Sequence, residues 1–179
     1  AEDLPLLTRW VKESFDALAS RKGLDLKAVN VSAYGASFVH LNKELQPVAP
    51  LYSYLKPFPP ALQEAFNREY DPDKQLARQT ASPDLGNLNS GMQLYRLKKQ
   101  RPEIFQQIRY SLHLPQYISF LLSGLCAADL TSIGCHTRLW DFEKQDYHEL
   151  AKEEVLPEKV AEIRSGDFLA IRRQDGIAV

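Results

Sequence analysis

The sequence predicts an α/β fold, because helical and strand patterns follow one another from the start of the chain. Residues 4–22 carry apolar side chains three or four positions apart, which indicates a helix with one apolar stripe. Val29 and Val31 then alternate with small polar residues, so residues 28–33 are a predicted strand. A second predicted strand follows at residues 37–42, after a loop that contains a glycine. Helical patterns return beyond it, which favours strands covered by helices.

Proline, glycine and apolar spacing predict the later elements. Residues 55–60 form a proline-rich corner, because proline fixes its own backbone and keeps the residue before it extended. Pro115 and Gly124 mark the start and the end of a buried helix. The other predicted elements are a helical span at 60–78 with a turn at 71–74, a loop at 81–91, helices at 90–101, 102–108 and 146–154, and two strands at 165–179.

Length and composition suit one domain of ordinary size. The chain has 179 residues, of which 44% are hydrophobic and 25% are charged, and these are globular proportions. The net charge of -1 gives no basic excess for nucleic acid and no polybasic run for a membrane surface. The most apolar run, residues 117–128, is shorter than the roughly 20 residues that span a bilayer. Two cysteines and no visible signal peptide favour a cytoplasmic protein.

Residues 124–142 concentrate cysteine, histidine and hydroxyl side chains, which raises the question of a metal site or a nucleophile. Structural zinc takes its ligands in close pairs such as C-x₂₋₄-C, whereas Cys126 and Cys135 are nine positions apart. Cys135 and His136 are neighbours in sequence, and neighbouring side chains usually point apart, so they are not a catalytic pair. No phosphate-binding glycine motif occurs. Residue patterns alone therefore indicate a polar pocket and no metal site.

Five blocks of sequence together resemble the FGGY carbohydrate kinases. Their order and spacing are similar to those in the first domain of these enzymes, and they are VNVSAYGASFVHLNKELQPVAPL (29–51), LNSGMQLYRLKKQRPEIF (88–105), LHLPQYISFLLSG (112–124), ADLTSIGCHTRLWDF (128–142) and LPEKVAEIRSGD (156–167). The resemblance covers most of the chain. It implies that residues 1–179 are a single, incomplete ribonuclease H-like domain of the actin and hexokinase type, without the N-terminal phosphate-binding strands.

The resemblance implies that Tyr34, Gly35 and Ala36 face the sugar, because they match the first substrate loop of the family. The alternative for this loop is a turn with an exposed tyrosine. A further family segment usually carries a tryptophan, an acidic residue and an arginine at alternate positions, but here it reads LYSYLKP. Tyr54 and Lys56 are the substitutes, since a tyrosine ring can stack on a sugar and a lysine can bind a hydroxyl or a phosphate. This departure leaves the identity of the sugar open.

Asp129, Thr131 and Ser132 match the family segment that forms or braces the floor of the sugar pocket. A polyol is held by a few convergent hydroxyl, amide and carboxylate groups in a concave site. Asp129 can accept two hydrogen bonds from sugar hydroxyls, while the two hydroxyl side chains can donate or accept. The alternative is that Asp129 or Thr131 caps a helix that begins here. The residues alone leave both roles open.

The resemblance implies an ATP-dependent kinase as the complete protein, with ATP and Mg²⁺ as cofactors and a sugar or polyol as its small-molecule partner. The family's phosphate hairpin and catalytic aspartate have no counterpart in these residues. We therefore expect no catalytic residue, bound cofactor, metal or kinase activity in this chain alone. The sequence begins without Met, which suggests a portion of a longer protein, and a homodimer is a further expectation. The alternative class is a non-catalytic carbohydrate-binding or interaction domain derived from such a kinase.

Overall fold

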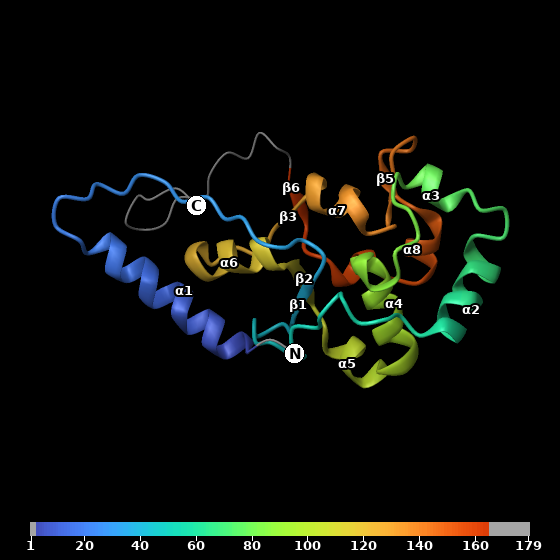
Figure 1. Ribbon diagram of the computed structural model, residues 1–179, viewed down its shortest axis with the longest axis horizontal. Coiled ribbons are helices and arrows are strands. Elements are labelled where there is room, and N and C mark those ends of the chain that lie inside the picture. The colour runs from blue at the N-terminus through green and yellow to red at the C-terminus, as the bar shows by residue number, and fades with distance from the viewer. Residues whose placement is uncertain (1–2, 165–179) are drawn as a thin grey trace.

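The computed structural model describes residues 3–164, in which short strands lie among helices (Figure 1). The strands expected at 165–179 lie outside these residues. The helices are α1 (Leu4–Ala19), α2 (Pro60–Tyr70), α3 (Leu76–Gln79), α4 (Ser90–Gln100), α5 (Pro102–Gln107), α6 (Leu114–Ser123), α7 (Leu130–His136) and α8 (Glu149–Glu153), with the 3₁₀ turns η1 (Gly86–Leu88) and η2 (Pro157–Lys159). The strands are β1 (Phe38–Leu41), β2 (Tyr110–His113), β3 (Ala128–Asp129), β4 (Trp140–Asp141), β5 (Asp146–Tyr147) and β6 (Ile163–Arg164).

The strands of residues 3–164 pair two by two. β1 runs antiparallel to β2, with Phe38 opposite His113, while β3 and β6 are parallel and β4 and β5 form an antiparallel hairpin. A parallel bridge between Ser111 and Val160 joins the β1–β2 pair to the chain that leads into β6. The register brings the start of β1 and the end of β2 to the same point, so the loop before β1 lies beside the start of α6.

Residues 28–33 do not form the predicted strand. Ala28 makes a single bridge, and the rest of the segment has no ladder partner among the described residues. Val29 packs instead against the small cluster formed by α1 and α6. The alternation that predicted a strand therefore comes from half-buried side chains, among them Val29, that alternate with exposed ones.

The helix boundaries follow their capping residues. The Asp3 carboxylate caps α1. Gly124 ends α6 with a φ of 76°, as the sequence predicts. The helix predicted at 146–154 is shorter, because residues 146–147 pair with β4 and α8 begins only at Glu149. Pairing with a neighbouring strand has overridden the local helical pattern at these two positions.

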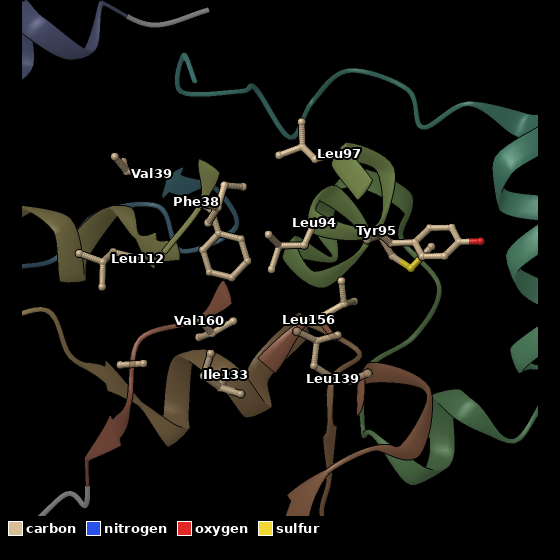
Figure 2. Close-up of a cluster of buried hydrophobic side chains, with 14 of the residues drawn as sticks. Phe38, Val39, Leu94, Tyr95, Leu97, Leu112, Ile133, Leu139, Leu156 and Val160 are labelled. Atoms are coloured by element: carbon tan, nitrogen blue, oxygen red, sulfur yellow. The ribbon is translucent and has the colours of Figure 1, made fainter. Parts of the chain in front are cut away.

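The main core is built around α4, which is buried along most of its length. Leu94, Tyr95 and Leu97 are all buried. Figure 2 shows Phe38 of β1 and Leu94 pointing toward each other, with Val160 beside them. Because α4 is enclosed on several sides, its polar side chains are buried together with the apolar ones.

Helix α1 lies at one edge of the molecule and packs on α6 (Figure 1). Val11 and Phe15 of α1 meet Leu122 of α6 in a second, smaller apolar cluster. The Thr8 and Tyr117 hydroxyls add a hydrogen bond of 2.8 Å across the same contact. The opposite face of α1 is open, and the Trp10 side chain is 62% exposed.

Two kinds of feature are absent from the described residues. Residues 3–164 contain no group of three or more histidine, cysteine, aspartate or glutamate side chains placed to hold a metal ion. Within the same span, no helix combines the length and the apolar character needed to cross a membrane. Cys126 and Cys135 are both free thiols, and burial raises the pKa of Cys126.

Candidate functional site

Asp129 is the N-cap of α7 and is held by three hydrogen bonds. Ser132 donates its backbone N–H to Oδ1 at 2.7 Å and its hydroxyl to Oδ2 at 2.8 Å. Gln116 of α6 donates from Nε2 to Oδ2 at 2.9 Å. An ionised carboxylate offers roughly four acceptor positions, so about one remains for another donor. The capping role that the sequence left open is thus established, and it coexists with a free acceptor position.

The Asp129 carboxylate is ionised at neutral pH. Partial burial pushes its pKa upward, but the hydrogen bonds from Gln116 and Ser132 outweigh burial and hold the pKa below its ordinary value. The carboxylate also lies at the positive end of the α7 backbone dipole, which favours its charged form. A fixed, half-buried negative charge of this kind can accept a hydrogen bond from a hydroxyl group.

Buried contacts clamp the loop that carries Tyr34, Gly35 and Ala36. Gly35 is half-buried in a turn, and Ala36 is 4% exposed, so of these three the Tyr34 side chain is the one open to solvent, at 37%. Gln93 of α4 donates to the Ala36 carbonyl at 2.6 Å, and Leu114 donates its N–H to the Ser37 carbonyl. The backbone of the loop is therefore fixed between α4 and the start of α6.

Tyr34 and Tyr54, which are far apart in the predicted site segments, meet in the structure. Their ring centroids are 5.9 Å apart and the rings are inclined at 51°. The segment that follows Tyr54 is held at Lys56, whose carbonyl accepts a hydrogen bond of 2.7 Å from Asn87 Nδ2. The Lys56 side chain is exposed and has no ion pair within residues 3–164. The two tyrosines form a joint aromatic surface, whereas Lys56 contributes to the described structure through its backbone.

The start of α6 connects the tyrosine loop with Asp129. Gln116 accepts the His113 N–H on Oε1 at 2.9 Å, while its Nε2 binds Asp129. Leu114, between His113 and Gln116 in the chain, holds the Ser37 carbonyl. Asp129 and Ser132 are thus bonded to each other and, through α6, to the loop. Thr131 is exposed, and its hydroxyl has no hydrogen-bond partner in the described part of the chain.

Three buried amide side chains support the site, and sequence reasoning did not select them. Gln93 donates at 2.6 Å to both the Ala36 carbonyl and the Asn87 carbonyl, and Asn87 in turn holds Lys56. Gln116 is the third. Gln93 lies four positions before Leu97 on the buried stripe of α4. A polar residue on an apolar helical stripe is the signal that could have identified it.

Comparison with known proteins finds sugar kinases similar to this chain. No family model matches the chain. A rhamnulokinase from Halalkalibacterium halodurans is 27% identical over 125 residues, which cover 66% of this chain and 26% of that protein. The chain therefore spans about a quarter of the length of this curated relative.

The structure is similar to a carbohydrate kinase from Novosphingobium aromaticivorans, with a TM-score of 0.76 and 25% identity, over 90% of this chain and 34% of that one. A ligand-bound xylulose kinase from Lactobacillus acidophilus gives a TM-score of 0.74 and 22% identity, over 89% of this chain and 32% of that one. The resemblance to the FGGY carbohydrate kinases is thereby confirmed. The predicted fold class, part of a ribonuclease H-like domain of the actin and hexokinase type, is confirmed as well.

Proposed function

We propose that the complete protein carrying this chain is an ATP-dependent sugar kinase, in which these residues form part of the wall that faces the sugar. The observation that carries the proposal is the hydrogen-bonded connection, through the start of α6, between the ionised Asp129 and the loop of Tyr34. These are two of the segments that the resemblance assigns to the sugar site. Relatives that are carbohydrate kinases by name support the same class.

The side chains at this wall have the chemistry of polyol recognition. Asp129 offers about one remaining acceptor position for a hydroxyl. Thr131 offers an exposed hydroxyl that can donate or accept, and Ser132 keeps the carboxylate oriented. The paired faces of Tyr34 and Tyr54 can cover the apolar C–H face of a sugar ring. These groups would orient the sugar and exclude water from one of its sides.

The described residues bind the sugar in this proposal and do not carry out the phosphoryl transfer. ATP supplies the phosphoryl group in such an enzyme, and Mg²⁺ neutralises its developing charge. Residues 3–164 contain no acidic cluster suited to a metal ion, and the sequence contains no glycine-rich phosphate loop. The proposal names no nucleotide or Mg²⁺ contact among residues 3–164. The single-domain boundary, the homodimer and the cytoplasmic location stay predictions.

The decisive experiment measures phosphoryl transfer by the complete protein. Purified protein, ATP and Mg²⁺ are combined in turn with L-rhamnulose, D-xylulose and a set of other ketoses and polyols, and ADP release is followed. Sugar-dependent ADP release that falls at least tenfold in kcat/KM in Thr131→Ala or Asp129→Ala supports the proposal. Sugar binding without any turnover supports the non-catalytic carbohydrate-binding alternative. Neither binding nor turnover across the set contradicts both.

A matched control separates a loss of sugar contacts from a loss of helix capping. Asp3 caps α1 through a hydrogen bond of 2.9 Å from the Leu6 N–H, the same chemistry by which Asp129 caps α7. Asp3→Ala should therefore cost some stability, but less than Asp129→Ala because only one exposed hydrogen bond is lost, while leaving the sugar KM and kcat unchanged.

A further inference from the structure

A small polar pocket lies behind the tyrosine segment, at the end of α4. It has a volume of about 210 Å³ and is lined by Tyr52, Arg96, Leu97, Gln100 and Arg101. Its wall is continuous with the candidate site, because Ser37 donates its hydroxyl to the carbonyl of Tyr52 at 2.9 Å. None of the residues that line it belongs to the set expected to contact the sugar.

Arg96 is a half-buried cation that has no carboxylate partner among residues 3–164. Its guanidinium stacks over the Tyr52 ring, 5.5 Å from the centroid. Burial lowers the pKa of Arg96, and the neighbouring Tyr52 offsets only part of this effect. A cation in this position has hydrogen-bond donors to offer to an anion that enters the pocket.

Two other buried or half-buried cations of the chain have carboxylate partners. The Arg138 guanidinium, which is 1% exposed, lies 3.2 Å from Asp71 Oδ2 and 3.3 Å from Asp84 Oδ1. Lys98, two positions beyond Arg96 on α4, lies 2.6 Å from the buried Glu154 carboxylate. Arg138 and Lys98 are thus paired with carboxylates of the same chain, whereas the charge of Arg96 is available to another partner.

Arg101 places a second guanidinium at the same pocket. Its contact with Glu103 is 3.8 Å long and both side chains are about two-thirds exposed, so this pair contributes little. The Gln100 amide and the Tyr52 hydroxyl are further donors on the lining, and the Tyr52 hydroxyl has no hydrogen-bond partner in the described residues. Two guanidinium groups together with neutral donors on one pocket lining suit a phosphate or carboxylate group.

We propose that this pocket binds a small oxyanion, a phosphate, sulfate or carboxylate group, between Arg96 and Arg101. At about 30 Å³ for each water molecule, the cavity can hold such a group together with a few waters. The bound group replaces the water that Arg96 has lost and accepts hydrogen bonds from both guanidinium groups. The proposal concerns a site beside the sugar wall, lined by other residues, and does not depend on kinase activity.

Binding is tested on the complete protein with inorganic phosphate, sulfate and acetate, each titrated against chloride at constant ionic strength. We expect saturable heat in calorimetry and a rise in Tm with phosphate and sulfate. Arg96→Gln should weaken phosphate binding at least tenfold, since hydrogen bonds to a charged group are lost. Arg68→Gln, which removes an exposed arginine on α2, is the matched control and should leave binding unchanged. Binding of acetate alone identifies a carboxylate site and supports the carboxylate form of the proposal.

A second measurement uses the unmodified sequence, so it does not depend on the folding of a variant. Phenylglyoxal modifies accessible arginines, and peptide mass spectrometry reports the extent at each position. Phosphate should protect Arg96 and Arg101 while Arg68 reacts at the same rate with and without it. The proposal would be overturned if none of the three anions bound saturably. It would also be overturned if Arg96→Gln left binding unchanged and phosphate did not protect Arg96 from modification.

Discussion

Gln116 and Asp129 are joined by a hydrogen bond of 2.9 Å between Nε2 and Oδ2, which connects α6 to the first residue before α7. The other end of the same amide accepts the buried His113 N–H. One side chain therefore fixes both the carboxylate of the candidate site and the entry into α6. A glutamine suits this position because it carries a donor and an acceptor on one planar group.

Replacing Asp129 by alanine should lower both stability and sugar turnover. Loss of the cap should cost about 0.5–2 kcal/mol in the free energy of unfolding. If the remaining acceptor position contacts the sugar, kcat/KM for the sugar should fall roughly tenfold to a hundredfold, while the KM for ATP changes little. Thermal unfolding and steady-state kinetics on the complete protein measure the two effects. Reduced Tm with intact sugar kinetics would restrict Asp129 to its capping role.

Gln116→Ala should destabilise the protein by about 1–3 kcal/mol, because the buried His113 N–H loses its acceptor. It should also raise the pKa of Asp129, since one of the hydrogen bonds that lower this pKa is removed. In the wild type, the ionised Asp129 stabilises the fold fully at pH values above the pKa that it has in the unfolded chain. This stabilisation is lost as the pH falls through the lower pKa that Asp129 has in the folded protein.

The stability difference between wild type and Gln116→Ala should therefore shrink from pH 7 to pH 3. Urea unfolding at both pH values tests this expectation. Gln107→Ala is the control, because the exposed Gln107 amide bonds only a backbone carbonyl of its own helix. A difference that stays constant with pH would show that Gln116 does not influence the charge of Asp129.

Glu154→Gln should destabilise the fold by about 2 kcal/mol. The Glu154 side chain is 4% exposed, and it is paired with Lys98 at 2.6 Å and Lys99 at 2.8 Å. Breaking a fully buried pair costs about 3–5 kcal/mol, and the value is smaller here because both lysines reach solvent. Glu149→Gln removes a similar charge from an exposed pair and should cost clearly less than Glu154→Gln. Equal losses in chemical denaturation would contradict this difference.

The contribution of Glu154 should also depend on pH. Burial raises its pKa, but hydrogen bonds from Lys98, Lys99 and Tyr70 outweigh burial and lower the pKa below its ordinary value. Because the pKa of Glu154 is lower in the folded than in the unfolded protein, its stabilisation is complete at pH values above the unfolded-state pKa. It disappears as the pH falls through the folded-state pKa. Wild type and Glu154→Gln should converge in acid, and Tm measured across that range checks this.

Gly91→Ala should destabilise the protein by about 1–3 kcal/mol, because a Cβ there would overlap the Thr137 carbonyl and lie 2.6 Å from Leu139 Cδ2. Gly134→Ala is the matched comparison. Its Cβ would meet only the Phe142 ring end, at 2.7 Å, and that exposed ring can turn aside. Alanine also favours a helix interior by about 0.5–1 kcal/mol, so this change should be nearly neutral. Similar losses in the two variants would refute the backbone-contact explanation.

Local sequence signals predicted those elements whose ends are defined by the chain itself. The stripe of α1, the glycine after α6 and the proline at the start of α5 all mark helices that the structure contains. The turn predicted at 71–74 separates α2 from α3. The predictions for residues 28–33 and 146–147 were wrong for one reason. Strand formation depends on a neighbouring strand to pair with. The first segment lacks one among the described residues, and the second has one in β4.

The residues that the sequence and its resemblance selected for the candidate site do not include the buried side chains that support it. Tyr34 and Tyr54 were expected at the site, and their rings meet. Gln93 and Gln116, which hold the loop and the carboxylate, were not selected because their role arises from contacts between distant segments. The spacing of residues along the sequence does not predict contacts between distant segments. Whether Lys56 or Thr131 touches a ligand stays a prediction.

The separate apolar cluster between α1 and α6 implies that the molecule does not open as one unit. Among residues 3–164, the buried members of this cluster are Val11, Phe15 and Leu122, which the main core does not include, although Leu4 of α1 belongs to that core. Amide protons of α1 should therefore exchange with solvent through a local opening of low free energy. Amide protons of β1 and β2 should exchange only when the whole protein unfolds. Native-state hydrogen exchange in low denaturant would show α1 as the first cooperative unit lost, with a slope smaller than that of the central strands.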